Sequence, residues 1–169
     1  MSTFFIFLIQ FTILAYALVG GVFLAFSDFI MRSLALTRGH AGPETMQVIN
    51  REVFRWVFMA LFLGMAAVSL VIAGYGAFGV PGPAGTLIMT AGLLYLVGCF
   101  GVTVLFNVPM NEALADMEVS SSATRDYWLQ TYVPRWTFWN SVRTFASAAS
   151  AALLLLGLLW MVQTQTQSV

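Results

Sequence analysis

The polar side chains that could carry chemistry lie near the start of the last apolar stretch of the chain. Trp136, Asn140 and Arg143 are spaced by four and three residues, so on a helix they share one face. An arginine in this position either reaches out to lipid headgroups or faces inward and pairs with a carboxylate such as Asp28 or Glu112. Because an amide gains nothing from facing lipid, the spacing favours an inward-facing Asn140 and Arg143.

A second polar group surrounds a proline at the end of the third apolar stretch. Pro109 has no backbone donor, which frees the carbonyl of Leu105 from its helical partner. Asn107, Asn111 and Glu112 flank this break. A break beside two amides and a carboxylate can line a polar cavity or simply end a span, and the pattern leaves both open.

The aromatic residues near Arg143 also allow two interpretations. Trp and Tyr often form a belt at the membrane interface, which is the simpler interpretation of this cluster. The alternative is the wall of a pocket. The segment before the second apolar stretch, from Pro43 through residues 44–56, predicts a helix that runs into that stretch without a breaker. Its apolar face, with Asn50 beside it, should meet another element.

The composition indicates that membrane-spanning helices position these residues. Of the 169 residues, 60% are apolar and 8% are charged, whereas soluble domains carry roughly 25% charged residues. The apolar stretches, each at least the ~20 residues needed to cross a bilayer, cover residues 4–27, 53–78, 84–106 and 138–162. Backbone groups in lipid must satisfy one another. We therefore expect an all-α integral membrane four-helix bundle, a single domain over residues 1–169, with helices extended beyond the bilayer on one side.

Composition also excludes several classes of protein. Without lysine the chain cannot form a Schiff base. One Cys and one His cannot build a disulfide framework or a tetrahedral zinc site, so we expect no metal. Seven acidic and seven basic residues give no net charge, which argues against a nucleic-acid partner.

The charged residues predict how the chain crosses the membrane. All of them lie between Asp28 and Arg55 or between Glu112 and Arg143, in the first and third connections of a four-span protein. The positive-inside rule places both connections in the cytoplasm and both termini outside. For a bacterial protein this means the inner membrane, with the lipid bilayer as the surrounding partner.

Small residues recur every four positions on three of the predicted helices. Such stripes let helix backbones approach closely. We interpret them as seams within the bundle, with a face for a homo-oligomer as the alternative. The stripes are Ala17, Gly21 and Ala25; Ala60 and Gly64; and Thr144, Ala148 and Ala152.

Four segments resemble a family of small four-helix bacterial membrane proteins that are described as anthrone-oxygenase-like or as of unknown function. The segments are residues 20–35, 46–51, 106–111 and 136–143, and together they span nearly the whole chain in the expected order. The resemblance implies that the chain oxidises an anthrone, or another hydrophobic aromatic compound, with O2 as co-substrate and no bound cofactor.

That reaction needs an apolar slot, a base and a donor for a developing oxyanion. The resemblance therefore implies catalytic roles for Glu112, as a base whose proton affinity is raised by desolvation, and for Arg143, as the oxyanion donor. It further implies a substrate site on the cytoplasmic side. Its residues would be Asn50, Arg51, Asn107, Asn111, Trp136, Trp139 and Asn140.

A non-enzymatic role is the competing hypothesis. The same polar cluster could lock a bundle that binds a lipid, a quinone or a partner protein, since equal numbers of Arg and acids would also build a neutral structural network. A pocket of several hundred Å³ walled by Trp136 and Asn140 would favour an enzyme or a ligand-binding protein. A filled junction with every Arg paired would favour structure alone. A channel or transporter is disfavoured by the absence of charge in the outer half.

Overall fold

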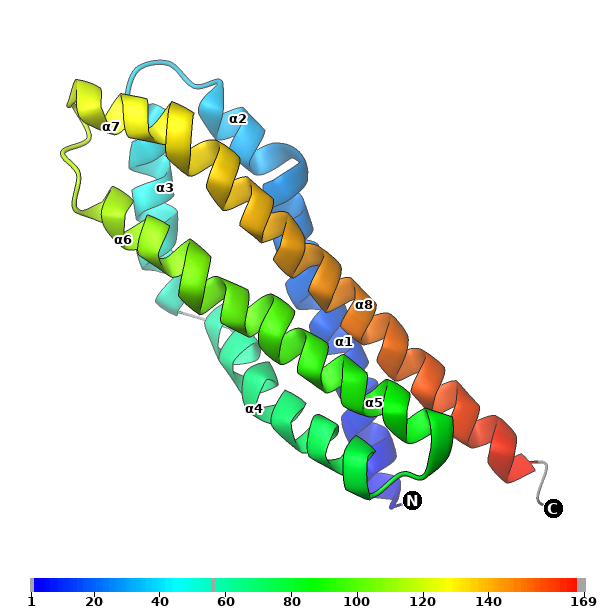
Figure 1. Ribbon diagram of the computed structural model, residues 1–169. Coiled ribbons are helices and arrows are strands. Elements are labelled where there is room, and N and C mark those ends of the chain that lie inside the picture. The colour runs from blue at the N-terminus through cyan, green and yellow to red at the C-terminus, as the bar shows by residue number, and fades with distance from the viewer. Residues whose placement is uncertain (1, 56, 167–169) are drawn as a thin grey trace.

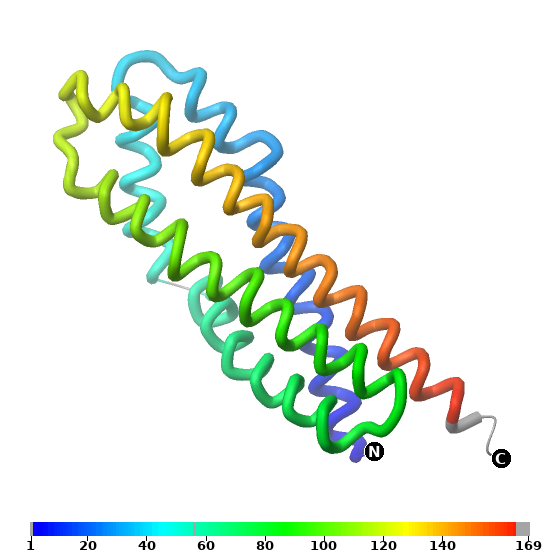
Figure 2. The backbone as a smooth tube through the Cα atoms, viewed as in Figure 1, coloured from blue at the N-terminus to red at the C-terminus, as the bar shows by residue number. Residues whose placement is uncertain are grey.

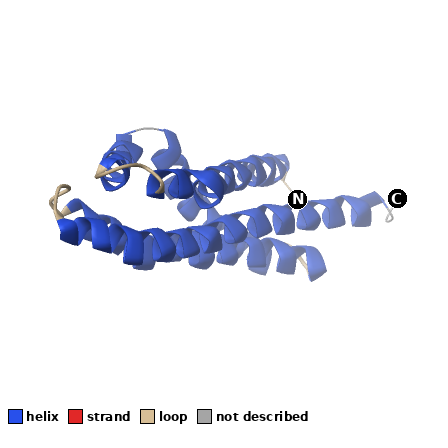
Figure 3. Ribbon diagram, turned by 90° about the horizontal axis from the view of Figure 1, so that it is seen from above, coloured by secondary structure: helices blue, strands red, loops and turns tan. Residues whose placement is uncertain are grey.

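The computed structural model describes residues 2–55 and 57–166, and all regular structure in these ranges is helical. Seen from above, the long helices run alongside one another (Figure 3). The elements are α1 (Thr3–Ala25), a π-helical turn (Phe26–Ile30), α2 (Met31–Ala35), α3 (Ala41–Glu52), a 3-10 turn (Val53–Arg55), α4 (Val57–Phe78), α5 (Gly82–Leu94), π-helical turns (Tyr95–Gly101 and Thr103–Asn107), α6 (Val108–Ala115), α7 (Ser122–Tyr127), a π-helical turn (Trp128–Tyr132) and α8 (Val133–Thr166).

Most of these elements join end to end into long rods. Thr3–Ala35, Gly82–Ala115 and Ser122–Thr164 are continuous helices and, with Val57–Phe78, are the four in the described chain that are long and apolar enough to cross a membrane. Large apolar side chains such as Phe4, Phe7 and Leu14 are exposed on their outer faces, as expected for contact with lipid. The predicted membrane four-helix fold, with helices that continue beyond the apolar spans, is confirmed.

The rods pack in the order α1, α8, α5 and α4. The N- and C-termini lie at one end of the bundle together with the short α4–α5 turn (Figures 1 and 2). The opposite end, which we call the charged end, is built from α2, α3, α6 and α7 and carries both long connections (Figure 1). The prediction that the two charged connections share one end is confirmed.

The prediction that the helix of residues 44–56 runs unbroken into the second span is wrong. The helix begins two residues before Pro43 but ends at Glu52, and the 3-10 turn Val53–Arg55 separates it from α4. Trp56, at the end of this segment, lies outside the described residues. Glu52 and Arg55 are three residues apart and form an ion pair, with Arg55 Nη1 3.3 Å from Glu52 Oε2. The interruption leaves α3 as a separate element at the charged end.

Wide π-helical turns precede two of the prolines. Asn107 ends one such turn and Pro109 follows; Tyr132 ends another and Pro134 follows. A proline ring clashes with the carbonyl four residues earlier, and a locally widened helix relieves that clash. The disturbance expected at Pro109 is therefore present, but the chain stays helical through it.

The small-residue stripes do not form the seams. Ala17 and Gly21 are exposed, and so are Ala148 and Ala152. The close approach of α1 and α8 occurs instead at Gly20, where an added Cβ would lie 3.2 Å from the Cβ of Ser147. The seam interpretation is wrong for these stripes, and a face for a homo-oligomer stays a prediction.

A glycine between α4 and α5 gives a test of this packing. A Cβ on Gly92 would lie 2.6 Å from the backbone oxygen of Ser69 and 2.9 Å from the backbone nitrogen of Ala73, so the helices must separate. Gly92→Ala is expected to lower stability by about 1–3 kcal/mol, measured by thermal unfolding in detergent. Gly64→Ala is the control, because its Cβ meets no atom within 4 Å and should gain about 0.5–1 kcal/mol from helix propensity. Equal effects of the two variants would contradict the close α4–α5 contact.

Candidate functional site

Arg143 lies inside the bundle near the charged end, and its side chain is 4% exposed. Nη2 donates a hydrogen bond of 2.6 Å to Asn140 Oδ1, and Nη1 donates one of 3.1 Å to Thr103 Oγ1. The Thr103 hydroxyl is turned to accept, because it donates its own proton to the backbone oxygen of Cys99. The inward-facing orientation predicted for Arg143 is confirmed.

No carboxylate of the described residues lies within ion-pairing distance of Arg143. Asp28 and Glu112, the partners that the sequence suggested, are both exposed, so the predicted pairing is wrong. The guanidinium instead lies over two aromatic rings, 4.1 Å from the centroid of Phe23 and 5.2 Å from that of Trp136. These contacts offset part of the cost of a buried charge, but Nε of Arg143 is buried without a hydrogen-bond partner. The site therefore holds an uncompensated positive charge.

Asn140 holds this arginine against the first helix. It is fully buried, and its Nδ2 donates to the backbone oxygen of Phe23 at 2.6 Å and to Ser27 Oγ at 2.7 Å. Since Nδ2 is used in this way, Oδ1 is left to accept from Arg143. All of its polar atoms are engaged within the protein, and it does not line the cavity described below. Asn140 thus holds the guanidinium of Arg143 from behind the cavity wall, and its contact with a substrate stays a prediction.

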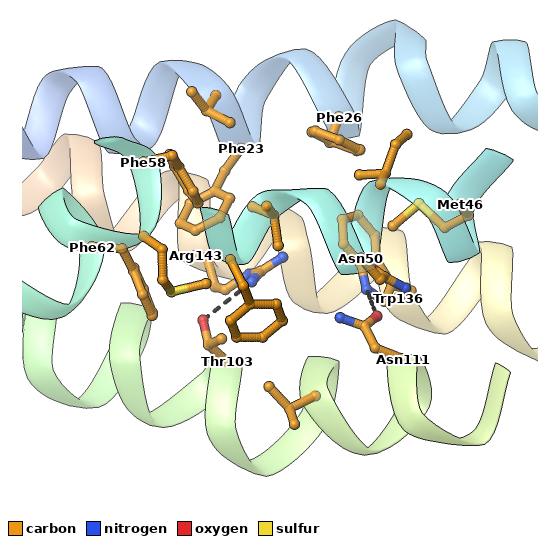
Figure 4. Close-up of a pocket in the computed structure, with 16 residues that line it drawn as sticks. Phe23, Phe26, Met46, Asn50, Phe58, Phe62, Thr103, Asn111, Trp136 and Arg143 are labelled. Atoms are coloured by element: carbon orange, nitrogen blue, oxygen red, sulfur yellow. Dashed lines mark hydrogen bonds between the residues drawn. The ribbon is translucent and has the colours of Figure 1, made fainter. Parts of the chain in front are cut away.

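Asn111 is fixed by two aromatic donors. Its Oδ1 accepts from Tyr132 Oη and from Trp136 Nε1, each at 2.8 Å. An indole N–H can only donate, so the oxygen of the amide must face Trp136 and the nitrogen must point elsewhere. In Figure 4 the amide nitrogen of Asn111 lies on the side that faces Arg143. Asn50 joins this group through a longer hydrogen bond of 3.4 Å from Nδ2 to Tyr132 Oη.

A cavity of about 90 Å³ lies between these polar groups. Figure 4 shows Phe23, Phe58 and Phe62 beside Arg143, and Asn50, Asn111 and Trp136 on the other side. No acidic residue is part of the lining. The lining residues come from α1 to the start of α4 (Val22, Phe23, Phe26, Met46, Ile49, Asn50, Val53, Phe54, Phe58, Met59, Phe62), from the third rod (Thr103, Val108, Asn111) and from α8 (Trp136, Arg143).

The size of the cavity is intermediate between the two outcomes that the sequence allowed. It is smaller than the several hundred Å³ typical of sites for drug-sized ligands, and it is large enough to hold several water molecules. It is also not a filled junction of paired charges, because Arg143 has no acidic partner. Phe54 lies on its rim and is 66% exposed, so this side chain can move without disturbing the core.

Asn107 lies behind the cavity rather than in its wall. It is buried, and its Nδ2 donates to the backbone oxygen of Trp136 at 3.2 Å. This carbonyl lies two residues after Pro134, in the first turns of α8. Asn107 Oδ1 is buried without a hydrogen-bond partner. The residue joins the third and fourth rods next to the site and does not touch the cavity.

Five of the nine predicted site residues do not line the cavity: Asn107 and Asn140, described above, and three more that lie further away. Glu112 is exposed on α6, so the expected desolvation of its carboxylate is wrong. Arg51 is exposed on α3. Trp139 is half-buried and stacks on Phe106 with the ring centroids 3.7 Å apart, outside the cavity lining. Of the predicted set, Arg143, Trp136, Asn50 and Asn111 do converge on the cavity.

The sequence contained signals for part of what was missed. Trp128, Tyr132 and Trp136 are spaced by four residues, the interval that places side chains on one helix face. The three rings stack in that order, with centroids 5.2 Å and 6.1 Å apart. These aromatic rings are buried, so the cluster is not a belt at the membrane interface. Thr103 precedes Asn107 and Asn111 at the same interval of four. Nothing in the sequence distinguishes Phe23 and Phe58, as residues of the site, from the many apolar residues around them.

A family model connects this site to known proteins. The model described as anthrone oxygenase matches residues 51–153, which include most of the cavity lining from α4 to Arg143. No curated protein and no solved structure matches the chain. The match covers more than half of the sequence, and it includes Thr103 and Asn140, which accept hydrogen bonds from Arg143. The chain therefore belongs to the anthrone oxygenase family.

Proposed function

We propose that the cavity, widened by movement of the exposed Phe54 side chain at its rim, binds an aromatic compound of the anthrone type and promotes its oxidation by O2 to a quinone, without a bound cofactor. The observation that carries the proposal is the buried guanidinium of Arg143, which lies in an aromatic cavity and has no carboxylate partner in the described part of the chain. A buried charge is costly unless it is paired. A substrate that becomes an anion in this cavity supplies the missing partner.

The first step is the loss of a proton from the methylene carbon of the anthrone. The resulting negative charge is delocalised onto the carbonyl oxygen of the anthrone, and Arg143 stabilises it there. The nitrogen of Asn111 adds a second donor, because its oxygen is held by Tyr132 and Trp136. No acidic residue lines the cavity, so the proposal assigns the proton to water or hydroxide at the cavity mouth rather than to Glu112.

The anion then reacts with O2. One electron passes from the anion to O2, and the two radicals combine at the former methylene carbon to form a C–O bond. The peroxide takes up a proton; loss of the remaining C–H proton and cleavage of the O–O bond then give the ketone and water. One oxygen atom of O2 enters the quinone and the other enters water, so the four electrons lost by carbon are gained by oxygen. The aromatic and aliphatic side chains that form most of the cavity wall favour O2, which is apolar.

Isotope labelling tests this proposal. The purified full-length protein in detergent, mixed with anthrone under ¹⁸O2, is expected to form anthraquinone that carries one ¹⁸O, with one O2 consumed per anthrone. The rate must exceed that of the same mixture with heat-denatured protein, because anthrones also oxidise slowly in solution. An equal rate in the two mixtures would contradict an oxygenase.

Binding without turnover is the second candidate function. It is favoured by one observation, the lack of an acidic or histidine side chain in the described cavity wall that could act as a base. In that case the cavity holds a quinone or a phenolate-like ligand against Arg143. The labelling experiment separates the two, since a binding protein retains the quinone but does not accelerate its formation.

The orientation in the membrane is part of the proposal. The arginines lie at the charged end of the bundle, and the positive-inside rule places this end in the cytoplasm. The site then opens toward the cytoplasmic leaflet of a bacterial inner membrane, where a hydrophobic aromatic substrate can partition.

A further inference from the structure

A second cleft lies at the charged end, apart from the cavity around Arg143. It has a volume of about 300 Å³ and lies between the turn that joins α2 to α3 and the start of the fourth rod. Its lining includes Arg38 and Thr37 from the turn, Pro43 from α3, and Arg125, Trp128 and Leu129 from the fourth rod. None of the residues that line the first cavity lines this one.

Two guanidinium groups give this cleft its charge. Arg38 and Arg125 come from distant parts of the sequence and both are exposed at the cleft. Neither lies within ion-pairing distance of a carboxylate of the described residues. Asp126 and Glu44 are neighbours along the chain, but neither is part of the lining. The cleft therefore presents two positive charges and no negative charge.

The indole of Trp128 adds a donor without a partner among the described residues. Its side chain is 3% exposed, and Nε1 makes no hydrogen bond to any of them. Nε1 is also not one of the fully enclosed polar atoms, so it retains access to the cleft that Trp128 lines. A buried indole N–H normally has a hydrogen-bond partner. In this cleft a ligand oxygen is the partner that the geometry allows.

The first turn of α3 lies beside the indole of Trp128 and forms part of the same cleft. A Cβ on Gly42 would lie 3.2 Å from Trp128 Nε1 and 2.5 Å from the backbone oxygen of Leu34, so only glycine fits between the indole and the helix start. Of the first turn of this helix only Pro43 is part of the lining, and a proline has no backbone N–H, so the helix start shapes the cleft without donating to a ligand.

We propose that this cleft binds a phosphate group. Two guanidinium groups and an indole N–H are all donors, and guanidinium groups match the geometry of phosphate oxygens. Leu129, in the lining, is 47% exposed, and Leu36, next to Thr37 of the lining in sequence, is 77% exposed. These apolar side chains suit contact with the acyl chains of an anionic lipid whose headgroup lies in the cleft. A free phosphate compound presents the same headgroup chemistry.

Ligand binding in this cleft is connected to the cavity around Arg143 through stacked aromatic rings. Trp128 stacks on Tyr132, and Tyr132 donates to Asn111 in the cavity wall. A ligand that fixes the indole of Trp128 thereby fixes the ring that positions Asn111. The phosphate site itself does not depend on the proposed oxygenase activity.

Binding to the full-length protein in neutral detergent provides the test. We would measure the binding of phosphatidylglycerol by native mass spectrometry, with phosphatidylcholine as the zwitterionic comparison and inorganic phosphate as a competitor. Arg38→Gln and Arg125→Gln are each expected to weaken phosphatidylglycerol binding roughly tenfold, since each removes a charged hydrogen bond. Trp128→Phe keeps one ring to stack on Tyr132 but removes the N–H together with the second ring of the indole, and is expected to weaken binding roughly fivefold. Arg135→Gln is the control, because Arg135 is exposed and lines neither the cavity nor the cleft.

The outcomes separate the two sources of phosphate. Phosphatidylglycerol binding that inorganic phosphate does not displace supports a lipid headgroup, and displacement by millimolar phosphate supports a site for phosphate compounds in general. Binding of inorganic phosphate alone supports a soluble ligand. Failure of both to bind would overturn the proposal, as would equal weakening by all three arginine variants, which indicates attraction to surface charge only. The thermal unfolding temperature of each variant, measured without ligand, shows that it is folded.

Discussion

Replacing Arg143 by methionine is expected to lower the rate of quinone formation from an anthrone by about 10²- to 10³-fold, the usual cost of removing a donor to a developing oxyanion. Methionine fills a similar volume without a charge. The substrate anion then forms in an apolar cavity with no positive partner. The measurement is kcat and KM from anthraquinone absorbance and O2 uptake, and the loss should appear mainly in kcat, because the anion develops only during the reaction.

Three controls make this result specific to the charge. Arg143→Lys keeps a positive charge but not the planar pair of donors that bind Asn140 and Thr103, so an intermediate rate is expected. Arg135→Gln, on the same helix, should be neutral because Arg135 is exposed. Binding of the neutral hydrocarbon anthracene should be unchanged in Arg143→Met. An unchanged kcat in this variant would remove Arg143 from the mechanism.

The four spans and the polar face of α8 could be predicted because each depends on local spacing. Apolar runs of about 20 residues are sufficient to identify the spans. Trp136, Asn140 and Arg143 lie on one face because their intervals of four and three match the helical repeat. The cost of exposing an amide to lipid then fixed which way that face points. These inferences need no knowledge of how distant segments meet.

The position of the carboxylates could not be predicted in this way. Glu112 follows Asn111 directly, and successive side chains on a helix point about 100° apart, so Asn111 enters the cavity while Glu112 faces outward. The equal numbers of acids and arginines made a partner for Arg143 a natural expectation. Pairing depends on distances between helices, and here hydrogen bonds to Asn140 and Thr103 and two aromatic rings take the place of a carboxylate.

The choice between a catalytic and a purely structural cluster depends on that missing carboxylate. A structural network of buried charges is normally closed, since an unpaired ion costs several kcal/mol. Here the described residues leave Arg143 with a net positive charge and an unpartnered Nε beside a cavity. A bundle that used this residue only for stability would gain from a carboxylate or an apolar substitute. The arrangement therefore favours a site that receives an anion.

Supplying that carboxylate by mutation is the sharpest test of this argument. In Asn140→Asp, a carboxylate oxygen takes the place of the amide oxygen that lies 2.6 Å from Nη2 of Arg143. The internal ion pair then satisfies the guanidinium, which no longer needs the substrate anion. The rate of quinone formation is expected to fall by about 10²-fold, close to the effect of removing the charge itself.

Asn140→Ala separates this effect from a loss of structure. Both variants lose the donor to the backbone oxygen of Phe23, which in the aspartate variant faces a carboxylate oxygen, although the Ser27 hydroxyl can donate to that carboxylate. The alanine variant loses both contacts and also leaves the guanidinium without its acceptor, at a cost of about 2–3 kcal/mol. Asn140→Asp should therefore unfold at a temperature no lower than that of Asn140→Ala, and yet be the less active of the two. If Asn140 served only to hold the bundle together, activity would follow stability in both variants, and the aspartate variant would be the more active one. The order of the two rates, measured on folded protein, thus decides whether the charge on Arg143 is used by a substrate.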